Sequence, residues 1–328
     1  MILVTGASGF VGSHTVERLQ ARGETVRCLV RPATDLGRLP AGTEIARADL
    51  TDPSTWPALE AAFEGVDAVI HVAGVTKALR PADYFAANAA ATETLARALR
   101  GRNIRLVLVS SLAAIGPSQD GQPVDEDEPP HPVSTYGVSK LQGEKFARDY
   151  VPDTVIIRPP VVYGPRDTGV FPILKSASRG VVLELSGGER WFSAIYVEDL
   201  ADGLWMATHA GPGGHPSGPR TYFMAHRQPV SWRQFGAVAA EIMGRRPRTL
   251  RIPLRAARAL GFFNEMWSRI SMNPAMISRE KVAEADYPFW TCDPARAAAD
   301  LGFEAPTPLA AGLAKTLAWY KEAGWLKY

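Results

Sequence analysis

ILVTGASGFVG, residues 2–12, is the stretch that decides the fold of this chain. Its apolar beginning, Ile2 to Val4, is typical of a short buried strand, and the glycines behind it predict a tight turn into a helix. Gly6 permits the turn, Gly9 permits close approach of a bound group, and Gly12 permits close packing of helix on strand. Such a turn points backbone N–H groups at an anion such as a dinucleotide pyrophosphate. The alternative is that the turn is only a connection, as in any α/β protein. Its position directly after the first strand favours cofactor binding.

Short apolar runs alternate with helical patterns through the first half of the chain. This alternation predicts a parallel sheet with helices on both faces, a doubly wound Rossmann-type α/β fold. The Pro-rich, acidic stretch 117–132 predicts a loop at the carboxyl edge of the sheet, and we interpret its run 125–128 as a solvated charged face. The predicted strands are 2–4, 25–30, 44–47, 68–71, 106–110 and 154–158, and the predicted helices are 11–22, 54–63, 82–99 and 134–150.

The alternation weakens after about residue 166. We expect a dinucleotide-binding Rossmann domain over 1–165 with later returns over about 193–225. Most of 166–328 then forms a small, mainly helical C-terminal subdomain that binds substrate. The stretch 211–220 predicts a surface connector. Near-helical spacing predicts a helix that contains Leu254, Ala257, Leu260, Phe263, Trp267 and Ile270.

Composition narrows the functional classes. A hydrophobic content of 46% and a charged content of 21% are ordinary for a globular protein, and a net charge of +2 argues against a nucleic-acid partner. The two cysteines, Cys28 and Cys292, favour a reducing compartment. We find no signal peptide, no membrane-spanning run and no histidine spacing typical of a metal site, so we expect a cytoplasmic protein without an integral membrane segment or a metal.

The second informative string is YGVSK, residues 136–140. It places the phenol of Tyr136 and the ammonium of Lys140 one helical turn apart on the same face. A free tyrosine has a pKa near 10 and is a poor base at neutral pH, but a nearby cation favours its phenolate. We therefore expect Tyr136 to act as the acid/base group and Lys140 to lower its pKa and to hold the nicotinamide ribose. The alternative is an ordinary pair on a helix surface.

Two hydroxyls end the predicted strand LVLVSS, residues 106–111. A hydroxyl there would face the nicotinamide and could bond a substrate oxygen beside Tyr136. We expect Ser111 in this role, with Ser110 as the second candidate. The alternative is a turn or helix-capping hydroxyl.

The end of the second predicted strand indicates which dinucleotide is bound. A site that prefers NAD places Asp or Glu there to accept from the ribose 2′-OH, whereas this chain has Arg31 and no acid until Asp35. A guanidinium suits a 2′-phosphate. We expect NADP(H), with NAD(H) as a possibility; the alternative for Arg31 is a solvated surface arginine.

Taken together, these strings resemble the extended short-chain dehydrogenase/reductase superfamily, which includes nucleotide-sugar epimerases and dehydratases. Further matches are the Asp49–Leu50 pair, HVAG at 71–74, Asn88, RPPVVYGP at 158–165 and the strand-to-helix element at 192–204. The resemblance implies catalytic residues Ser111, Tyr136 and Lys140. It also implies a cofactor site made of Gly6, Ser8, Gly9, Phe10, Val11, Gly12, Arg31, Asp49, Leu50, Val72, Ala73, Gly74, Thr76, Asn88, Ser110, Tyr136, Lys140, Pro159, Pro160 and Val162.

Departures from the superfamily pattern favour one branch. Val161 stands where many nucleotide-sugar enzymes carry an Asn for the diphosphate, and Leu112 and Ala113 stand where dehydratases carry an Asp–Glu pair. Arg31 and the C-terminal sequence are similar to dihydroflavonol reductases and 3β-hydroxysteroid dehydrogenases. The aromatic tail suits an apolar pocket, with a subdomain core as the alternative; its members are Phe262, Phe263, Trp267, Phe289 and Trp290.

This branch implies an NADP(H)-dependent oxidoreductase that interconverts a ketone or aldehyde and an alcohol on a mainly apolar small-molecule substrate. A nucleotide-sugar epimerase that uses the cofactor transiently is the alternative enzyme. A non-catalytic NADP(H)-sensing protein is an alternative of another class. A homodimer is common among such relatives.

Overall fold

A seven-stranded parallel sheet forms the centre of the computed structural model, which describes residues 1–185, 187–209, 220–256, 258–259 and 283–328. The strand order is β11-β6-β5-β4-β1-β2-β3. The chain moves outward in opposite directions from β1, so the carboxyl ends of β1 and β4 border the crevice where such sheets bind ligands. The strands are β1 (Ile2–Thr5), β2 (Val26–Val30), β3 (Glu44–Arg47), β4 (Ala68–His71), β5 (Arg105–Val109), β6 (Val155–Arg158) and β11 (Thr221–Phe223).

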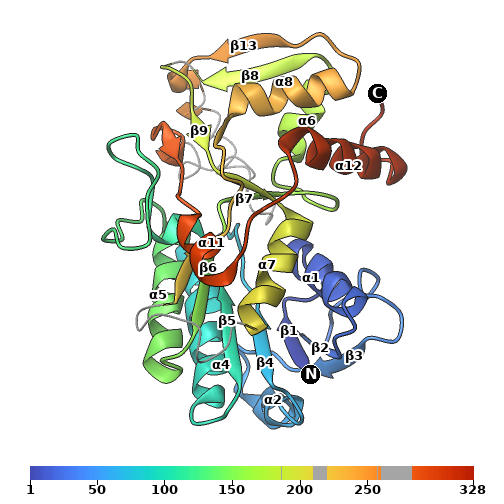
Figure 1. Cartoon of the computed structure of the whole chain (residues 1–328), viewed down its shortest axis with the longest axis vertical. Helices are drawn as coiled ribbons and strands as arrows, with labels where there is room; N and C mark the ends of the chain where they lie inside the picture. The colour runs from blue at the N-terminus through green and yellow to red at the C-terminus, as the bar shows by residue number, and fades with distance from the viewer. Residues whose placement is uncertain (186, 210–219, 257, 260–282) are drawn as a thin grey trace.

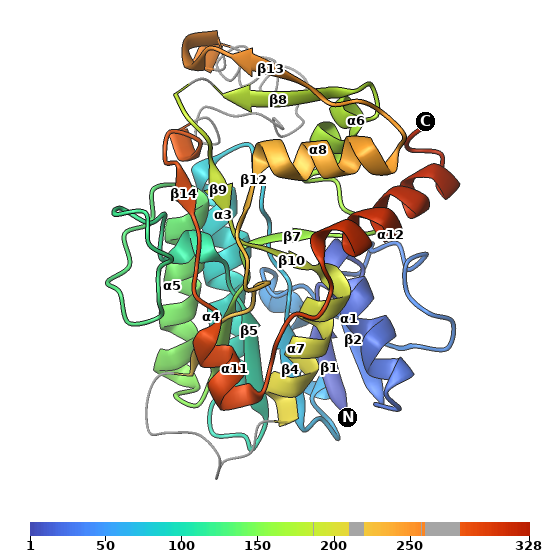
Figure 2. The ribbon, with the colours of Figure 1, turned by 45° about the horizontal axis from the view of Figure 1, so that its top comes forward.

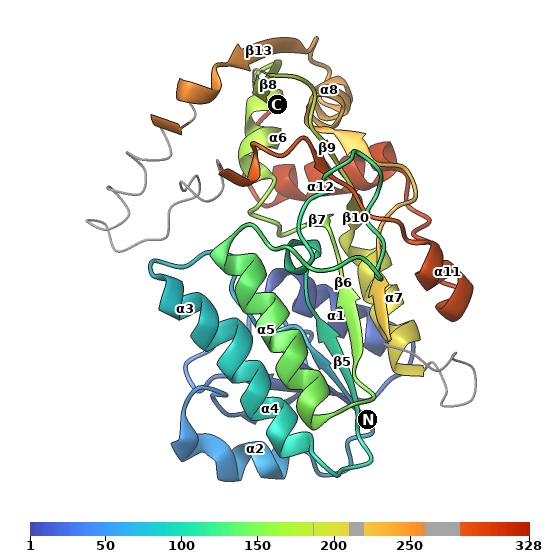
Figure 3. The same ribbon diagram turned by 90° about the vertical axis from the view of Figure 1, so that its left-hand side faces the viewer.

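Helices cover both faces of this sheet (Figure 1). On one face, α1 (Phe10–Ala21) and α7 (Val197–His209) bury Val16, Leu19 and Leu200 against the strands. On the other face, shown in Figure 3, lie α2 (Trp56–Ala62), α4 (Ala91–Leu99) and α5 (Thr135–Tyr150). Strands buried on both faces need apolar residues at nearly every position, which is the pattern read from the sequence. The predicted Rossmann-type fold is therefore confirmed, and all six predicted strands are present.

The predicted helix 82–99 is present but not uniform. It consists of α3 (Pro81–Phe85), a single π-helical turn (Ala86–Ala90) and α4. A π turn inserts one residue into the helix and is common at functional sites. Two 3₁₀ turns, Pro53–Thr55 and Leu112–Ala114, precede α2 and follow β5.

The rest of the chain builds a second layer above the sheet (Figure 2). Its helices are α6 (Phe171–Ala177), α8 (Trp232–Ile242) and α12 (Leu309–Glu322). Its strands form small sheets that the sequence did not predict: β7 (Val161–Tyr163) with β10 (Ala194–Tyr196), β12 (Val230–Ser231) with β9 (Trp191–Phe192) and β14 (Phe289–Trp290), and β8 (Val181–Leu185) with β13 (Arg248–Ile252). The helix α11 (Ala295–Leu301) instead packs beside β11, the edge strand of the central sheet (Figure 2). The predicted connector and the predicted helix over 254–270 lie almost wholly outside the described residues.

The acidic run 125–128 is not a solvated face throughout. The Glu126 side chain is 3% exposed, and its carboxylate accepts a 2.8 Å hydrogen bond from the Phe223 backbone N–H. Phe223 lies in β11, the edge strand, whose outward N–H has no neighbouring strand to bond. Glu126 supplies the missing acceptor and so fixes the 117–132 loop over the sheet edge. Burial raises the pKa of Glu126.

Candidate active site and cofactor cradle

The glycine turn is required by close backbone packing. Gly6 has φ +65°, and a Cβ there would lie 2.6 Å from the Ala73 backbone nitrogen. A Cβ at Gly12 would lie 2.1 Å from the Gly6 carbonyl oxygen. No side chain among the described residues caps α1 at Gly9, so the first N–H groups of the helix face the sheet edge unsatisfied. A pyrophosphate fits this arrangement, and the predicted neighbours Ser8, Phe10 and Val11 are only half-buried around it.

A buried histidine fixes the strand next to the turn. His71 Nδ1 lies 2.7 Å from Thr5 Oγ1, and its Nε2 lies 3.0 Å from Thr92 Oγ1. Because Thr92 donates to the Asn88 carbonyl, its oxygen must accept from His71, so Nε2 carries the proton and Nδ1 accepts from Thr5. Burial lowers the pKa of His71 to about 3, which keeps it neutral. Thr5 Oγ1 also accepts a hydrogen bond from the Ala73 N–H at 3.2 Å. The network therefore holds the backbone that lies beside the glycine turn.

Asn88 holds the loop that follows β4. Its side-chain oxygen accepts from the Val75 N–H at 2.8 Å, and its amide donates to the Val75 carbonyl and to Ser139 Oγ, both at 3.0 Å. A Cβ on Gly74 would meet the Asn88 oxygen at 2.7 Å. Asn88 therefore supports the backbone of the loop that contains Val75. The predicted cofactor residues Val72, Ala73, Gly74 and Thr76 lie along this supported loop, and Thr76 is exposed.

Arg31 lies exposed just beyond β2, at the carboxyl edge of the sheet. Asp49 accepts from the N–H and hydroxyl of Thr51, and these bonds, followed by the charge of Arg31, lower the Asp49 pKa. Asp35, the first acid after Arg31, accepts instead from the Gly37 N–H at 2.9 Å. Arg31 forms no ion pair with any described residue. The predicted neighbour Leu50 is buried.

The predicted catalytic residues are brought together. Ser134 caps α5 by accepting from the Gly137 N–H, which places Tyr136 in the first turn. Burial raises the pKa of Tyr136 to about 12, while a hydrogen bond from Ser111 opposes the shift. Ser111 Oγ also accepts from the Ala113 N–H at 3.1 Å, so it has the capping contact as well as the contact with Tyr136. The ring of Tyr84 lies 6.2 Å from that of Tyr136 between centroids.

Lys140 lies buried below Tyr136. Its ammonium donates to the Val109 carbonyl at 2.7 Å. Burial lowers the pKa of Lys140 to about 8, and the charge of Glu144 opposes this shift. Tyr136, Lys140 and Glu144 are spaced four residues apart, so they share one face of α5.

Glu144 is a residue that the sequence analysis missed. It accepts from Ser110 Oγ at 2.5 Å and forms a two-pronged ion pair with Arg158, at 2.9 and 2.7 Å. Both partners of the pair are almost fully buried. The Ser110 hydroxyl therefore points toward Glu144, and Ser111 is the serine that contacts Tyr136. The i+4 spacing from Lys140 was the sequence feature that could have revealed Glu144.

The loop after β6 lies beside the turn that carries Ser111. The Pro159 carbonyl accepts from the Leu112 N–H at 2.9 Å, which ties this loop to the turn that carries Ser111. Pro160, Val161 and Val162 are half-buried beside it, and Val161 and Val162 lie in β7. Of the aromatic tail, Phe289 and Trp290 form β14, and the Trp290 indole donates to the Glu284 carbonyl at 2.9 Å. Phe262, Phe263 and Trp267 lie outside the described residues.

Glu284 brings a further acidic group toward Tyr136. Its charge adds to the burial that raises the Tyr136 pKa. Across the described ranges, no group of three or more His, Cys, Asp and Glu side chains is arranged to hold a metal ion.

Comparisons with known proteins agree with this geometry. Residues 2–218 match the model of the NAD-dependent epimerase/dehydratase family. The chain is 32% identical to a ceramide reductase of Caulobacter vibrioides over 99% of its own length and 96% of that protein. It is also 32% identical to a 4-hydroxy-2-methyl-3-oxo-4-farnesyl-3,4-dihydroquinoline-1-oxide ketoreductase of Stigmatella aurantiaca, with 80% of each chain covered.

A solved structure shows the same arrangement. MoeE5 in complex with UDP-glucuronic acid and NAD superposes with a TM-score of 0.73 at 26% identity, covering 98% of this chain and 99% of that one. The resemblance drawn from the sequence is thereby confirmed. This chain belongs to the NAD-dependent epimerase/dehydratase family and is an NAD(P)-dependent enzyme.

Proposed function

We propose that the protein is an NADP(H)-dependent reductase that interconverts a ketone and an alcohol on an apolar substrate. The observation that carries this proposal is the Ser111–Tyr136 hydrogen bond above buried Lys140, with apolar groups next to it. The residues directly after Ser111 are the buried apolar Leu112 and Ala113. They stand in place of the Asp–Glu pair of dehydratases, so no carboxylate is there to remove the further proton that dehydration requires. The two 32%-identical relatives, named as a reductase and a ketoreductase, support the same reaction type.

The residues of the site have distinct tasks in this proposal. The nicotinamide, when bound, supplies or accepts a hydride. Tyr136 donates a proton to the substrate oxygen in reduction and takes it back in oxidation, and Ser111 holds that oxygen. Lys140 orients the ribose. The expected lowering of the Tyr136 pKa by Lys140 is not seen. Burial, Glu284 and Tyr84 raise that pKa, and among the described residues only the Ser111 hydrogen bond opposes them. The Lys140 ammonium is bonded instead to the Val109 carbonyl. Glu144, through its charge, favours the protonated form of Lys140 against the effect of burial.

The preference for NADP(H) rests on Arg31. It is exposed, forms no ion pair with the described residues, and both neighbouring acids are bonded elsewhere. Asp49 is near enough for Arg31 to lower its pKa but forms no ion pair with it, so a 2′-phosphate would be the anion that bonds the guanidinium. We further propose that residues 1–165, with the return through α7 and β11, bind the cofactor, and that most of 166–328 binds the substrate.

A nucleotide-sugar epimerase is the second candidate, because MoeE5 was solved with UDP-glucuronic acid and NAD. Thermal melting separates the two. A ligand at about 100 times its Kd stabilises by about 2.7 kcal/mol, so NADP⁺ should raise Tm, and UDP, dTDP or GDP should add nothing. Further stabilisation by one nucleotide would favour the epimerase.

Consumption of NADPH with long-chain and polycyclic ketones then tests the reaction itself. Tyr136→Phe should lower turnover by about 10²–10⁴-fold, the usual contribution of general acid–base catalysis, and should leave the NADP⁺-induced rise in Tm intact. Near-normal turnover in this variant would exclude the proposed mechanism. An unmodified protein that gains Tm with NADP⁺ but turns over none of these ketones would instead favour the NADP(H)-sensing role, which needs no acid/base tyrosine.

A further inference from the structure

The end of the molecule opposite the N-terminus carries an unusual density of unpaired basic groups. Figure 1 shows β8, β13, α6 and α8 there, with the C-terminus beside them. Exposed cations come from three separate segments that meet at this place. We call them the basic end: Lys175, Arg179, Arg245, Arg246, Arg248 and Lys327. Within the described residues, none of the six forms an ion pair with an acid.

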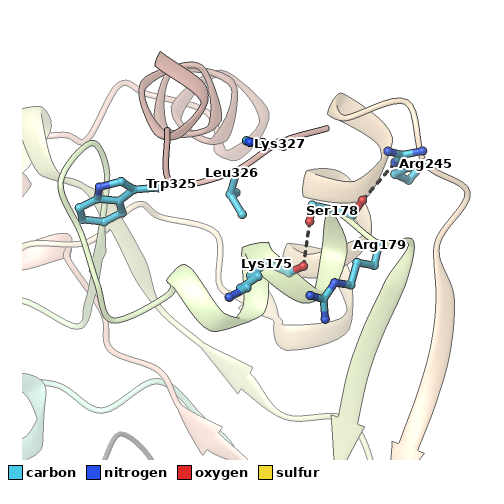
Figure 4. A pocket seen from close by; sticks show the side chains of 7 residues that line it. All are labelled: Lys175, Ser178, Arg179, Arg245, Trp325, Leu326 and Lys327. Carbon is cyan, nitrogen blue, oxygen red and sulfur yellow. Dashed lines mark hydrogen bonds between the residues drawn. The ribbon is translucent and has the colours of Figure 1, made fainter. Parts of the chain in front are cut away.

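Four of these cations line one pocket of about 420 Å³ (Figure 4). Its other lining residues are Ser178, Trp325 and Leu326, and no acidic residue lines it; the four cations are Lys175, Arg179, Arg245 and Lys327. Arg245 is held in place because its Nε donates to the Ser178 carbonyl at 3.0 Å. Cations gathered around one pocket repel each other, so the arrangement is suited to an external anion.

Exposed aliphatic side chains lie beside these cations. β8 and β13 form a two-stranded parallel sheet in which Leu183 is opposite Leu250, and these residues are 42% and 55% exposed. Ile242, at the end of α8 shortly before Arg245, is 38% exposed. The acids next to these side chains are Glu184, which pairs with Arg251, and the exposed Glu241 on α8, so the six unpaired cations outnumber them. Large apolar groups exposed next to an excess of positive charge indicate a binding surface.

We propose that the basic end docks on the anionic surface of a phospholipid membrane. The cations would meet the phosphate headgroups, one of which the pocket would take up, and Leu183 and Leu250 would enter the boundary of the acyl chains. No helix in the described part of the chain is long and apolar enough to cross a bilayer. Attachment through the cations and leucines of this surface would be peripheral and reversible. Given the proposed function, on which this last step rests, it would bring the enzyme to apolar substrates that reside in the bilayer.

Two other occupants fit less well. A nucleic acid would contact the cations, but the exposed leucines offer no stacking surface for its bases. The ring of Trp325, the aromatic residue of the pocket, already packs against Phe171 and Tyr320. A free phosphate would fill the pocket and would leave Leu183, Leu250 and the outlying Arg246 and Arg248 without a role.

Co-sedimentation with vesicles tests the proposal without any substrate, so its result is independent of the proposed reaction. Vesicles of equal parts phosphatidylcholine and phosphatidylglycerol should bind the protein, and binding should weaken as salt is raised. Vesicles of phosphatidylcholine alone should not. Each Lys or Arg near an anionic surface contributes about fivefold in affinity, so Arg246→Glu with Arg248→Glu should weaken binding by at least about tenfold.

The matched control is Arg100→Glu with Lys145→Glu, which reverses two exposed charges, one directly after α4 and one on α5, and should leave vesicle binding unchanged. Leu250→Ser should weaken binding while keeping its salt dependence. All variants should keep the Tm and the NADP⁺ response of the unmodified protein. Equal binding to both vesicle types, or an unchanged affinity in the Arg246/Arg248 variant, would overturn the proposal. So would competition in which a DNA duplex or inorganic phosphate is bound in preference to the vesicles.

Discussion

Burial lowers the pKa of Lys140, and this shift has a measurable effect on the free energy of unfolding. The folded lysine loses its proton near pH 8, whereas an unfolded lysine keeps it to about pH 10.4. Between these values the unfolded chain binds more protons, so the free energy of unfolding rises with pH. Below pH 8, burying the charged ammonium costs roughly 3 kcal/mol relative to the neutral amine.

We therefore predict that Lys140→Met is inactive but more stable at neutral pH. The gain in the free energy of unfolding should be about 1–2 kcal/mol. It is smaller than the cost of burying the ammonium because the Val109 carbonyl loses its hydrogen-bond donor. Urea denaturation of both proteins at neutral pH and at about pH 10 measures the difference in their free energies of unfolding. The difference in favour of Lys140→Met should be smaller at the higher pH. A stability difference that does not change with pH would contradict the assigned cause.

The proposed preference for NADP(H) rests on a single residue, Arg31. Arg31→Ala should weaken NADP⁺ binding by about 10–100-fold, the effect of losing one charge-assisted hydrogen bond, and should leave NAD⁺ binding unchanged. Titration calorimetry with both dinucleotides measures the two affinities in the same variant. Arg100→Ala, another exposed arginine, is the control. An equal loss for both cofactors would mean that Arg31 does not read the 2′-phosphate.

Among the elements, the π turn Ala86–Ala90 links the helix α3–α4 to the cofactor cradle. It contains Asn88, whose side chain makes three hydrogen bonds to Val75 and Ser139. Asn88→Ala removes all three and should lower the free energy of unfolding by about 2–4 kcal/mol. It should also weaken NADP⁺ binding, since the loop after β4 loses its support.

Ser139→Ala is the matched control for Asn88, because it removes one of the three bonds and leaves both contacts with Val75. Urea denaturation and calorimetry should show a smaller loss of stability and nearly normal NADP⁺ affinity. If Asn88→Ala behaves like Ser139→Ala, the loop does not depend on the asparagine.

The same elements show what the sequence could and could not predict. β1, β2, β4, β5 and β6 were readable because a strand buried on both faces is a nearly continuous apolar run, whereas the edge strand β3 (EIAR) is only partly buried. The π turn was not, because the apolar spacing on either side of Asn88 still follows a helix. Likewise, Glu126 looks like any acid in a charged loop, and its burial depends on β11, which is 97 residues away along the chain. Ser110 and Ser111 are adjacent, and only the placement of Glu144 on α5 shows which one faces Tyr136.

At the scale of the whole molecule, Arg166 ties the cofactor helix to the second layer. It follows β7, and its guanidinium bonds Glu17 on α1 at 2.9 and 2.6 Å and also contacts the ring of His14. Among the described residues it is the only non-glycine with a positive φ, +72°. A side chain at that φ costs roughly 1–2 kcal/mol, which the contacts to α1 must offset.

This arrangement predicts an inverted order of stability at position 166. Arg166→Ala loses the contacts to α1 and keeps the strained backbone, whereas Arg166→Gly loses the same contacts and removes the strain. Although glycine usually destabilises a chain relative to alanine, the glycine variant should here be the more stable of the two by about 1 kcal/mol. Urea denaturation of both variants beside Glu17→Gln, which breaks the ion pair alone, measures this. If the alanine variant is equally stable, the backbone at 166 relaxes when the guanidinium is removed, and the positive φ is then a consequence of the contact with α1 rather than a property of the loop.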